Sequence, residues 1–109
     1  MSSFLERSIE DISLVPMEDI TTSYYFRFSA VDRPGVLSKI AGVLGQHNIS
    51  IAAVIQKGRT ADSAGAVPVV MTTHRSVERD VRVALKEIDR LDVVRRKTIR
   101  IRVEDESLQ

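Results

Sequence analysis

The sequence predicts one α+β domain, in which a four-stranded antiparallel sheet carries two helices on one face. Strand-type alternation and helix-type spacing of apolar residues follow one another along the chain in the order βαββαβ. The 109 residues suffice for one packed core, but they do not suggest two domains. Because crossovers between parallel strands are right-handed, two successive βαβ units fold into the ferredoxin-like plan.

The composition excludes several classes of function. Sixteen basic and fifteen acidic residues give a net charge of +1, so we expect no general attraction to nucleic acid or to an anionic membrane. The absence of cysteine removes disulfides, thiolate metal sites, a copper-carrying variant of the fold and thiol nucleophiles. No apolar run approaches the ~20 residues of a membrane span, and the N-terminus does not resemble a secretory signal. We therefore expect a cytoplasmic protein.

The first βαβ unit begins with a strand over 24–31, one face of which would carry Phe26, Phe28 and Ala30. The strand stops at Asp32, which we expect to act as the N-cap of a helix with Pro34 at its first position. Apolar residues then recur at helical spacing over 36–44. Asn48 ends the helix, because asparagine tolerates the left-handed cap conformation.

The second unit follows a strand over 49–56 and a polar turn. A third strand is expected over 64–73, with irregular pairing at Pro68, which lacks the N–H that a ladder needs. Ser76 is a plausible N-cap for a second helix, whose apolar stripe runs to Leu91.

Charged residues on the second helix and the last strand are expected to face solvent. Glu78 and Arg82 would form an i,i+4 pair on the outer face of the helix. The last strand, over 98–103, alternates apolar residues with Arg100 and Arg102. The basic run from Arg95 to Arg102 could hold a phosphate backbone, but we favour a solvated sheet edge.

The two ends of the chain differ from its centre. Residues 1–22 predict a lead-in or linker, with a possible short helix in which Leu5, Ile9 and Ile12 have helical spacing. The domain itself is expected over 23–104, followed by a polar tail over 105–109.

The segment 32–35, Asp-Arg-Pro-Gly, is the most informative feature for function. A helix N-terminus presents unpartnered N–H groups and a partial positive charge, and a glycine there lets a carboxylate or phosphate approach the backbone. Asp32 could then face the ammonium group of an amino acid, or it could only cap the helix. Asn48 and Ser50, at the other end of this helix, could bind a small polar ligand or serve the cap alone.

No catalytic or metal-binding pattern is recognisable. His47 and His74 have no ligand partners at metal-site spacing, so we expect no metal. The serines lie in no nucleophile-elbow context, and glycine-rich nucleotide fingerprints are absent from the sequence.

With these residues in place, the chain resembles the ACT domain, a small ligand-binding regulatory module. The resemblance rests on Val-Asp-Arg-Pro-Gly-Val-Leu over 31–37, an amphipathic helix, and His-Asn-Ile-Ser-Ile over 47–51. A narrower resemblance, to the ACT domain at the C-terminus of homoserine dehydrogenases, rests on residues 50–51, 54–57, 67–70, 73–74 and 84–88. The segment Val-Pro-Met-Glu-Asp-Ile over 15–20 looks like the linker of those enzymes. Altogether the resemblance covers about residues 14–103.

The resemblance implies regulation and no catalytic residue in this chain. ACT domains typically form homodimers through a sheet edge or face and bind an amino acid, here expected to be L-threonine, between two copies. The implied effector-binding residues are Asp32, Arg33, Gly35, Val36 and Leu37 of one copy, with Asn48, Ile49 and Ser50 of the other. No cofactor is expected here, and NAD(P) would bind the parent enzyme's catalytic domain ahead of residue 1.

Other functions share the same order of elements. A ligand-free dimerisation module of the same fold would keep the architecture without the site. An RRM-like nucleic-acid-binding domain needs stacking aromatics on its central strands, and the third strand has none. An acylphosphatase-like enzyme would need an arginine loop and a catalytic amide, roles for which Arg33 and Asn48 have the wrong spacing.

Overall fold

A computed structural model describes residues 14–56, 58 and 60–103 of the chain. The expected short helix at Leu5, Ile9 and Ile12 and the tail over 105–109 lie outside the described residues. The elements are the 3-10 turn η1 (Met17–Asp19), the helices α2 (Val36–Gln46) and α3 (Glu78–Asp89), and the strands β1 (Thr21–Val31), β2 (Ile51–Ile55), β3 (Ala66–Thr73), β4 (Ser76–Val77) and β5 (Ile99–Val103).

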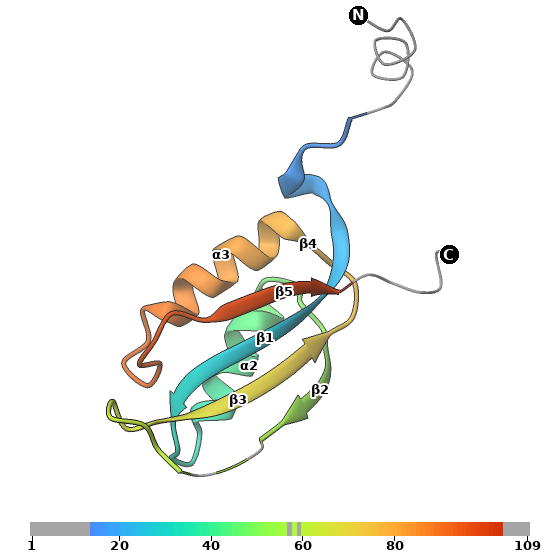
Figure 1. The fold of residues 1–109 in the computed structure, drawn as a ribbon. Helices are drawn as coiled ribbons and strands as arrows, with labels where there is room; N and C mark the ends of the chain where they lie inside the picture. Colours follow the sequence, from blue (N-terminus) through green and yellow to red (C-terminus); the bar gives the residue numbers. More distant parts are fainter. Residues whose placement is uncertain (1–13, 57, 59, 104–109) are drawn as a thin grey trace, which may run out of the picture.

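The expected antiparallel sheet is confirmed, with β1 at its centre (Figure 1). β1 pairs with β3 from Tyr25↔Thr72 to Val31↔Ala66, and with β5 from Ser23↔Val103 to Arg27↔Ile99. β2 pairs with the far side of β3. β1 and β2 therefore run parallel on either side of β3, as a split βαβ unit requires.

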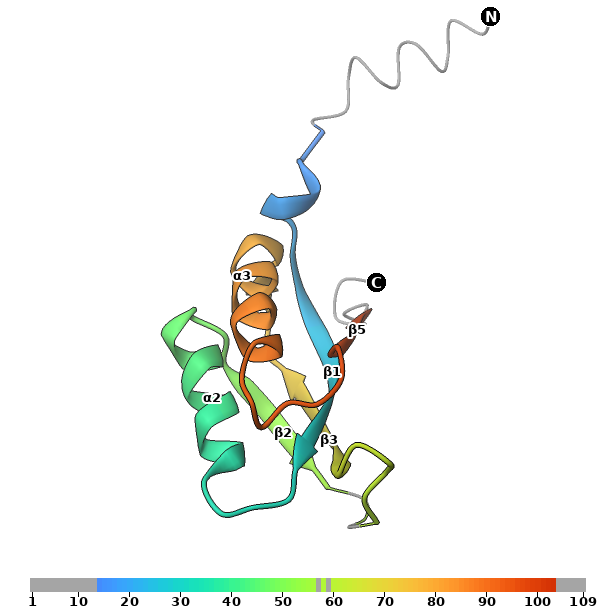
Figure 2. The ribbon, with the colours of Figure 1, turned by 90° about the vertical axis from the view of Figure 1, so that its left-hand side faces the viewer.

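The core lies between the sheet and the helical layer, which covers one face only (Figure 2). The alternation predicted for the first strand is confirmed, since Tyr24, Phe26, Phe28 and Ala30 are all fully buried. The helices supply the opposing side chains, among them Ile40 and Leu44 from α2 and Val81, Ala84 and Ile88 from α3. Each fully buried Val, Leu or Ile side chain of this kind contributes about 1.5–3 kcal/mol to stability.

The other face of the sheet is open and partly apolar. Ile99, Ile101 and Val103 of β5 are 52, 54 and 42% exposed. Ile101 lies opposite Tyr25, whose neighbours Tyr24 and Phe26 point into the core, so these three residues belong to the open face. Arg100 and Arg102 consequently face the helical layer, which corrects the expectation that they point outward.

Several predicted boundaries were wrong for identifiable reasons. β1 begins at Thr21 rather than Tyr24, because Thr21 and Thr22 pair with β4. Ser76 is therefore a strand residue and not an N-cap, and its hydroxyl donates to the carbonyl of His74. Pairing through Pro68 with Ser29 is regular, and the irregularity lies between Ile51 and Ala53 instead.

Candidate functional site

The loop between β1 and α2 is a tight turn whose geometry differs from the sequence prediction. The amide of Arg33 donates to the carbonyl of Val31 (3.0 Å), and the amide of Val36 donates to that of Arg33 (3.3 Å). Gly35 has φ 87° and is the N-cap residue of α2. The predicted cap by Asp32 and the placement of Pro34 at the first helical position are wrong, because the left-handed glycine delays the helix to Val36.

Among the residues that the structure describes, no side chain closes the N-terminus of α2. Its first turn contains no acidic residue, and its N-cap residue, Gly35, makes no side-chain cap bond. The first amides of a helix carry a partial positive charge and lack intrahelical acceptors. Of these, the amide of Val36 is bonded within the loop, which leaves the next amides directed at whatever occupies the space in front of them.

That space is a cleft of about 470 Å³. Its lining mixes the polar loop with apolar strand residues: Val31, Asp32, Arg33, Pro34, Gly35, Val36, Leu37, Gln56, Val67 and Val69. The structure thus brings together one predicted half of the site, Asp32 to Leu37. The sequence interpretation missed Gln56, Val67 and Val69. Because β1 and β2 run parallel, their carboxyl ends meet at one edge of the sheet, and this rule could have located Gln56.

The second predicted half lies at the far end of α2. Asn48 adopts φ 62°, so the predicted left-handed cap is confirmed. The backbone N–H of Asn48 donates to the carbonyl of Gly45 (3.1 Å), and the backbone N–H of Ile49 donates to the carbonyl of Leu44 (3.0 Å). These are the two bonds of a Schellman motif. Ile49 is 3% exposed and packs in the core, while the carbonyl of Ser50 accepts from His74 (2.9 Å).

The two halves do not meet within one chain. An 11-residue helix separates them, a length of about 16 Å. Residues 48–50 can therefore approach a ligand in front of Gly35 only in a second copy, and their part in binding stays a prediction.

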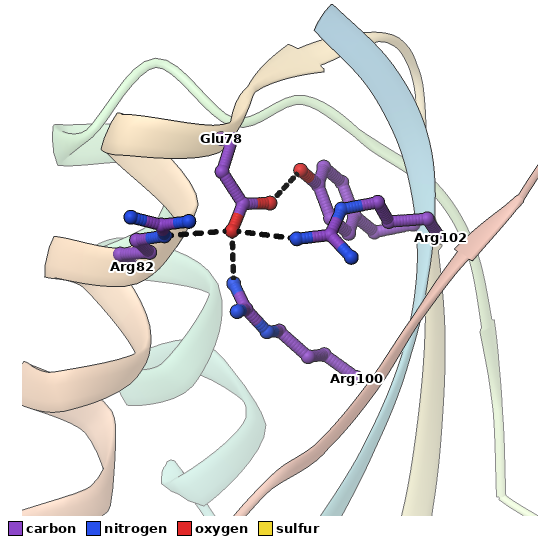
Figure 3. Close-up of polar contacts among 5 residues, drawn as sticks. Glu78, Arg82, Arg100 and Arg102 are labelled. Carbon is purple, nitrogen blue, oxygen red and sulfur yellow. Dashed lines mark hydrogen bonds and ion pairs between the residues drawn. The ribbon is translucent and has the colours of Figure 1, made fainter. Parts of the chain in front are cut away.

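A second polar cluster, which the sequence interpretation misplaced, surrounds Glu78 at the start of α3 (Figure 3). This carboxylate is fully buried rather than on the outer face. Its Oε2 accepts from Arg82 Nε (2.8 Å), Arg100 Nη1 (2.7 Å) and Arg102 Nη2 (3.0 Å), and its Oε1 accepts from the hydroxyl of Tyr24. The predicted outward orientation is therefore wrong for Arg100 and Arg102, whose side chains face Glu78 while remaining 34 and 42% exposed.

The environment of Glu78 shifts two pKa values in opposite directions. Burial alone would raise the pKa of Glu78, but hydrogen bonds from Tyr24, Arg82 and Arg102 outweigh it and hold that pKa at about 2. Burial and the bond to Glu78 raise the pKa of Tyr24 to about 12. Both groups thus keep their charge states throughout the physiological pH range, so the cluster is a permanent ion pair network.

The comparison with known families decides between the functions left open by the order of elements. The profile of the ACT domain matches residues 24–93. The chain belongs to the ACT domain family. This membership removes the RRM-like and acylphosphatase-like alternatives, and the open face of β3, with Pro68, Val70 and Thr72, agrees with it because it offers no stacking aromatic.

Relatives of the ACT chain include several homoserine dehydrogenases. It is 40% identical to the enzyme of Neisseria gonorrhoeae and 33% identical to that of Pseudomonas aeruginosa, in each case over 94% of this chain and 23% of the relative. The crystal structure of a homoserine dehydrogenase from Thiobacillus denitrificans superposes with a TM-score of 0.76 at 40% identity, over 87% of this chain and 20% of that one. The chain thus spans about a quarter of the length of the curated relatives it matches.

A more distant likeness concerns the fold alone. The ACT domain from the GTP pyrophosphokinase of Chlorobium tepidum superposes with a TM-score of 0.56 at 13% identity.

Within residues 14–56, 58 and 60–103, no three ligating side chains gather in a way that could hold a metal ion. In the same residues, no helix combines the length and the apolar character needed to cross a bilayer.

Proposed function

We propose that this ACT domain senses a free amino acid, L-threonine, at the N-terminus of α2. The observation that carries the proposal is the uncapped start of α2, which faces a cleft of about 470 Å³. The α-carboxylate of an amino acid suits the partial positive charge of the exposed amides. Gly35 has no side chain that would keep the ligand from the backbone.

Each predicted residue has a role in this proposal. The backbone around Arg33, Gly35, Val36 and Leu37 receives the carboxylate, and Asp32 lies in the same cleft, where its carboxylate can face the ammonium group. Asn48 and Ser50 of a second copy meet the ligand hydroxyl or ammonium. Ile49 is buried in its own core, so it contributes through its backbone and by fixing the position of its neighbours.

The second copy is supplied by a homodimer that pairs through a sheet edge or the open face. Two features support association. β2 is an edge strand with exposed side chains from Ala52 to Ile55, and β5 exposes three branched apolar residues. Unpaired edge groups and apolar surface both favour pairing with another chain.

The regulated partner is a catalytic domain upstream in the same polypeptide. Similarity to homoserine dehydrogenases supports an NAD(P)-dependent oxidoreductase of the cytoplasm as the parent enzyme. Threonine held between two copies would favour one dimer arrangement and so change the geometry of the attached domains. A coupling free energy of about 1–3 kcal/mol suffices for useful inhibition.

The second candidate function is a dimerisation module that binds no effector. The apolar open face, with Ile99, Ile101 and Val103, favours it, because this surface promotes association whether or not the cleft is occupied. The two candidates agree on a dimer and differ on the ligand.

Calorimetry and sedimentation on the 109-residue chain separate these candidates. We expect a dimer that binds L-threonine but not D-threonine, with binding lost in Gly35→Val and kept in Gly42→Ala. A dimer that binds no amino acid at millimolar concentration supports the dimerisation module and overturns the sensor. A monomer that binds nothing overturns both candidates.

A further inference from the structure

A second cleft, separate from the proposed threonine site, runs between α3 and β5. Its volume is about 430 Å³, and its lining residues are Arg82, Val83, Leu85, Lys86, Asp89, Lys97, Thr98 and Arg100. It shares no lining residue with the cleft in front of α2.

Most of the charged side chains that line this cleft are cationic. Four of the lining residues carry a positive charge, whereas Asp89 is the one acid among them. Asp89 Oδ1 accepts from the amide of Thr98 (3.0 Å) and from the hydroxyl of Thr98 (2.6 Å), and these bonds orient the carboxylate but leave its single charge outnumbered by four cations. Lys86 and Lys97 are exposed and form no ion pair with the residues that the structure describes. The positive charge of the cleft is therefore not balanced from within.

The two arginines that line this cleft, Arg82 and Arg100, are held in place by Glu78. Arg82 Nε and Arg100 Nη1 both bond to Oε2 of the buried Glu78, at 2.8 and 2.7 Å, and Figure 3 shows them reaching it from α3 and from β5. Each of these bonds uses one nitrogen of a guanidinium that has five N–H donors. A ligand thus meets oriented donors and need not order two flexible side chains.

Glu78 cannot neutralise the group it organises. One carboxylate is shared by three arginines, since Arg102 also contacts Oε2 at 3.0 Å. The lysines add to this excess from both walls: Lys86 lies one helical turn from Arg82, and Lys97 directly precedes Thr98. An anion with several charges is the ligand that complements such a surface.

We propose that the cleft between α3 and β5 binds a diphosphate group. Lys86, Lys97 and the outer nitrogens of Arg82 and Arg100 contact its oxygens. Val83, which is 49% exposed, offers apolar surface to whatever the diphosphate is attached to. Inorganic pyrophosphate and a nucleoside diphosphate share this recognition chemistry, and affinity for the two distinguishes the sources.

The test titrates inorganic pyrophosphate, and separately ADP, into the isotopically labelled full chain while amide resonances are followed. The expected shifts concentrate in 82–89 and 97–100, and affinity falls as salt rises from low to physiological concentration. ADP binding more tightly than pyrophosphate identifies a nucleotide as the source, and equal affinity identifies the free anion. Shifts centred on 32–38, or no saturable binding at millimolar pyrophosphate in low salt, overturn the proposal.

Two charge-matched variants separate a site from general attraction. Lys86→Ala with Lys97→Ala removes two cations from the cleft, and affinity should fall about tenfold or more. Arg90→Ala with Arg95→Ala removes two cations outside it, and affinity should change by less than about threefold. Equal weakening in both variants contradicts a specific site. If either variant folds poorly, the map of shifted resonances in the unaltered chain still decides the test. The result bears only on the diphosphate proposal, because the threonine proposal concerns a different cleft.

Discussion

The two helices of this domain begin in opposite ways. The first turn of α3 carries Glu78 and Asp80, and the amide of Glu78 donates to the carbonyl of Ile20 (2.8 Å). The first turn of α2 carries no acid, follows a left-handed glycine and faces a cleft. A helix N-terminus attracts negative charge in either case. The chain supplies that charge itself in the first turn of α3 but not in the first turn of α2, so one helix start is a structural joint and the other a candidate binding site.

The largest predicted effect concerns the start of α3, where Glu78 is buried. Glu78→Ala leaves three arginines and the hydroxyl of Tyr24 without their shared acceptor, and we expect a loss of about 3–5 kcal/mol in the free energy of unfolding. Urea denaturation measures it. Glu87→Ala, which removes an exposed carboxylate paired with His47, is the control and should cost less than about 1 kcal/mol. Similar losses in both variants would mean that burial of Glu78 contributes little.

Acid titration tests the same contribution of Glu78 to stability. The pKa of Glu78 falls from 4.5 in the unfolded chain to about 2 in the fold, so the unfolded state binds more protons between these values. The contribution of ionised Glu78 to the free energy of unfolding is complete above about pH 5 and is lost as the pH falls through 2. In total this contribution is about 3 kcal/mol.

The measurement is the free energy of unfolding of the unaltered chain and of Glu78→Gln across this range. The pKa of Asp62, also held at about 2 through its bond to Arg96, affects both proteins equally and cancels in the difference. Parallel pH profiles would contradict the role of Glu78.

The open helix start is tested by two glycines with opposite expectations, Gly35 just before α2 and Gly42 inside it. Gly35→Ala forces a side chain into φ 87° and should destabilise the fold by about 1–2 kcal/mol. Gly42→Ala lies in the helix interior, where an added Cβ meets nothing within 4 Å, and should stabilise by about 0.5–1 kcal/mol. Thermal unfolding compares them. A shift of the same sign in both variants would refute the assignment of Gly35 to a left-handed turn.

The smallest effect concerns the other end of α2. Asn48→Gly preserves the left-handed cap and should leave stability nearly unchanged, whereas Asn48→Ala should cost about 1 kcal/mol. Calorimetry with L-threonine then separates the two roles of the side chain. Loss of binding in the stable glycine variant indicates a ligand contact across the dimer. Unchanged binding limits Asn48 to capping.

Local patterns predicted what local physics determines. The alternation around Phe26 and Phe28 predicted which residues of β1 share the face that is buried in the structure, because strand side chains alternate whatever their partners are. The cap at Asn48 was also predictable, since few residues accept φ 62°. The start of α2 was not, because Pro34 suits a first helical position and Gly35 suits a turn, and only the loop bonds decide between them.

Features that depend on register could not be read from the chain alone. The last strand alternates Ile and Arg, and hydrophobicity favours burial of isoleucine. Pairing with β1 turns the arginines inward instead, where Glu78 balances part of their charge. An i,i+4 Glu–Arg pair looks the same in sequence whether it is exposed or buried, so the location of Glu78 required the fold.

The joint at α3 also determines how the chain enters the domain. The 3-10 turn η1 leads directly into β1, Thr21 and Thr22 pair with β4, Arg79 contacts Asp19, and the guanidinium of Arg75 donates to Thr21. A tilt of α3 would therefore move the chain around Met17 with it. A domain joined to the chain ahead of this point would therefore change its orientation together with α3.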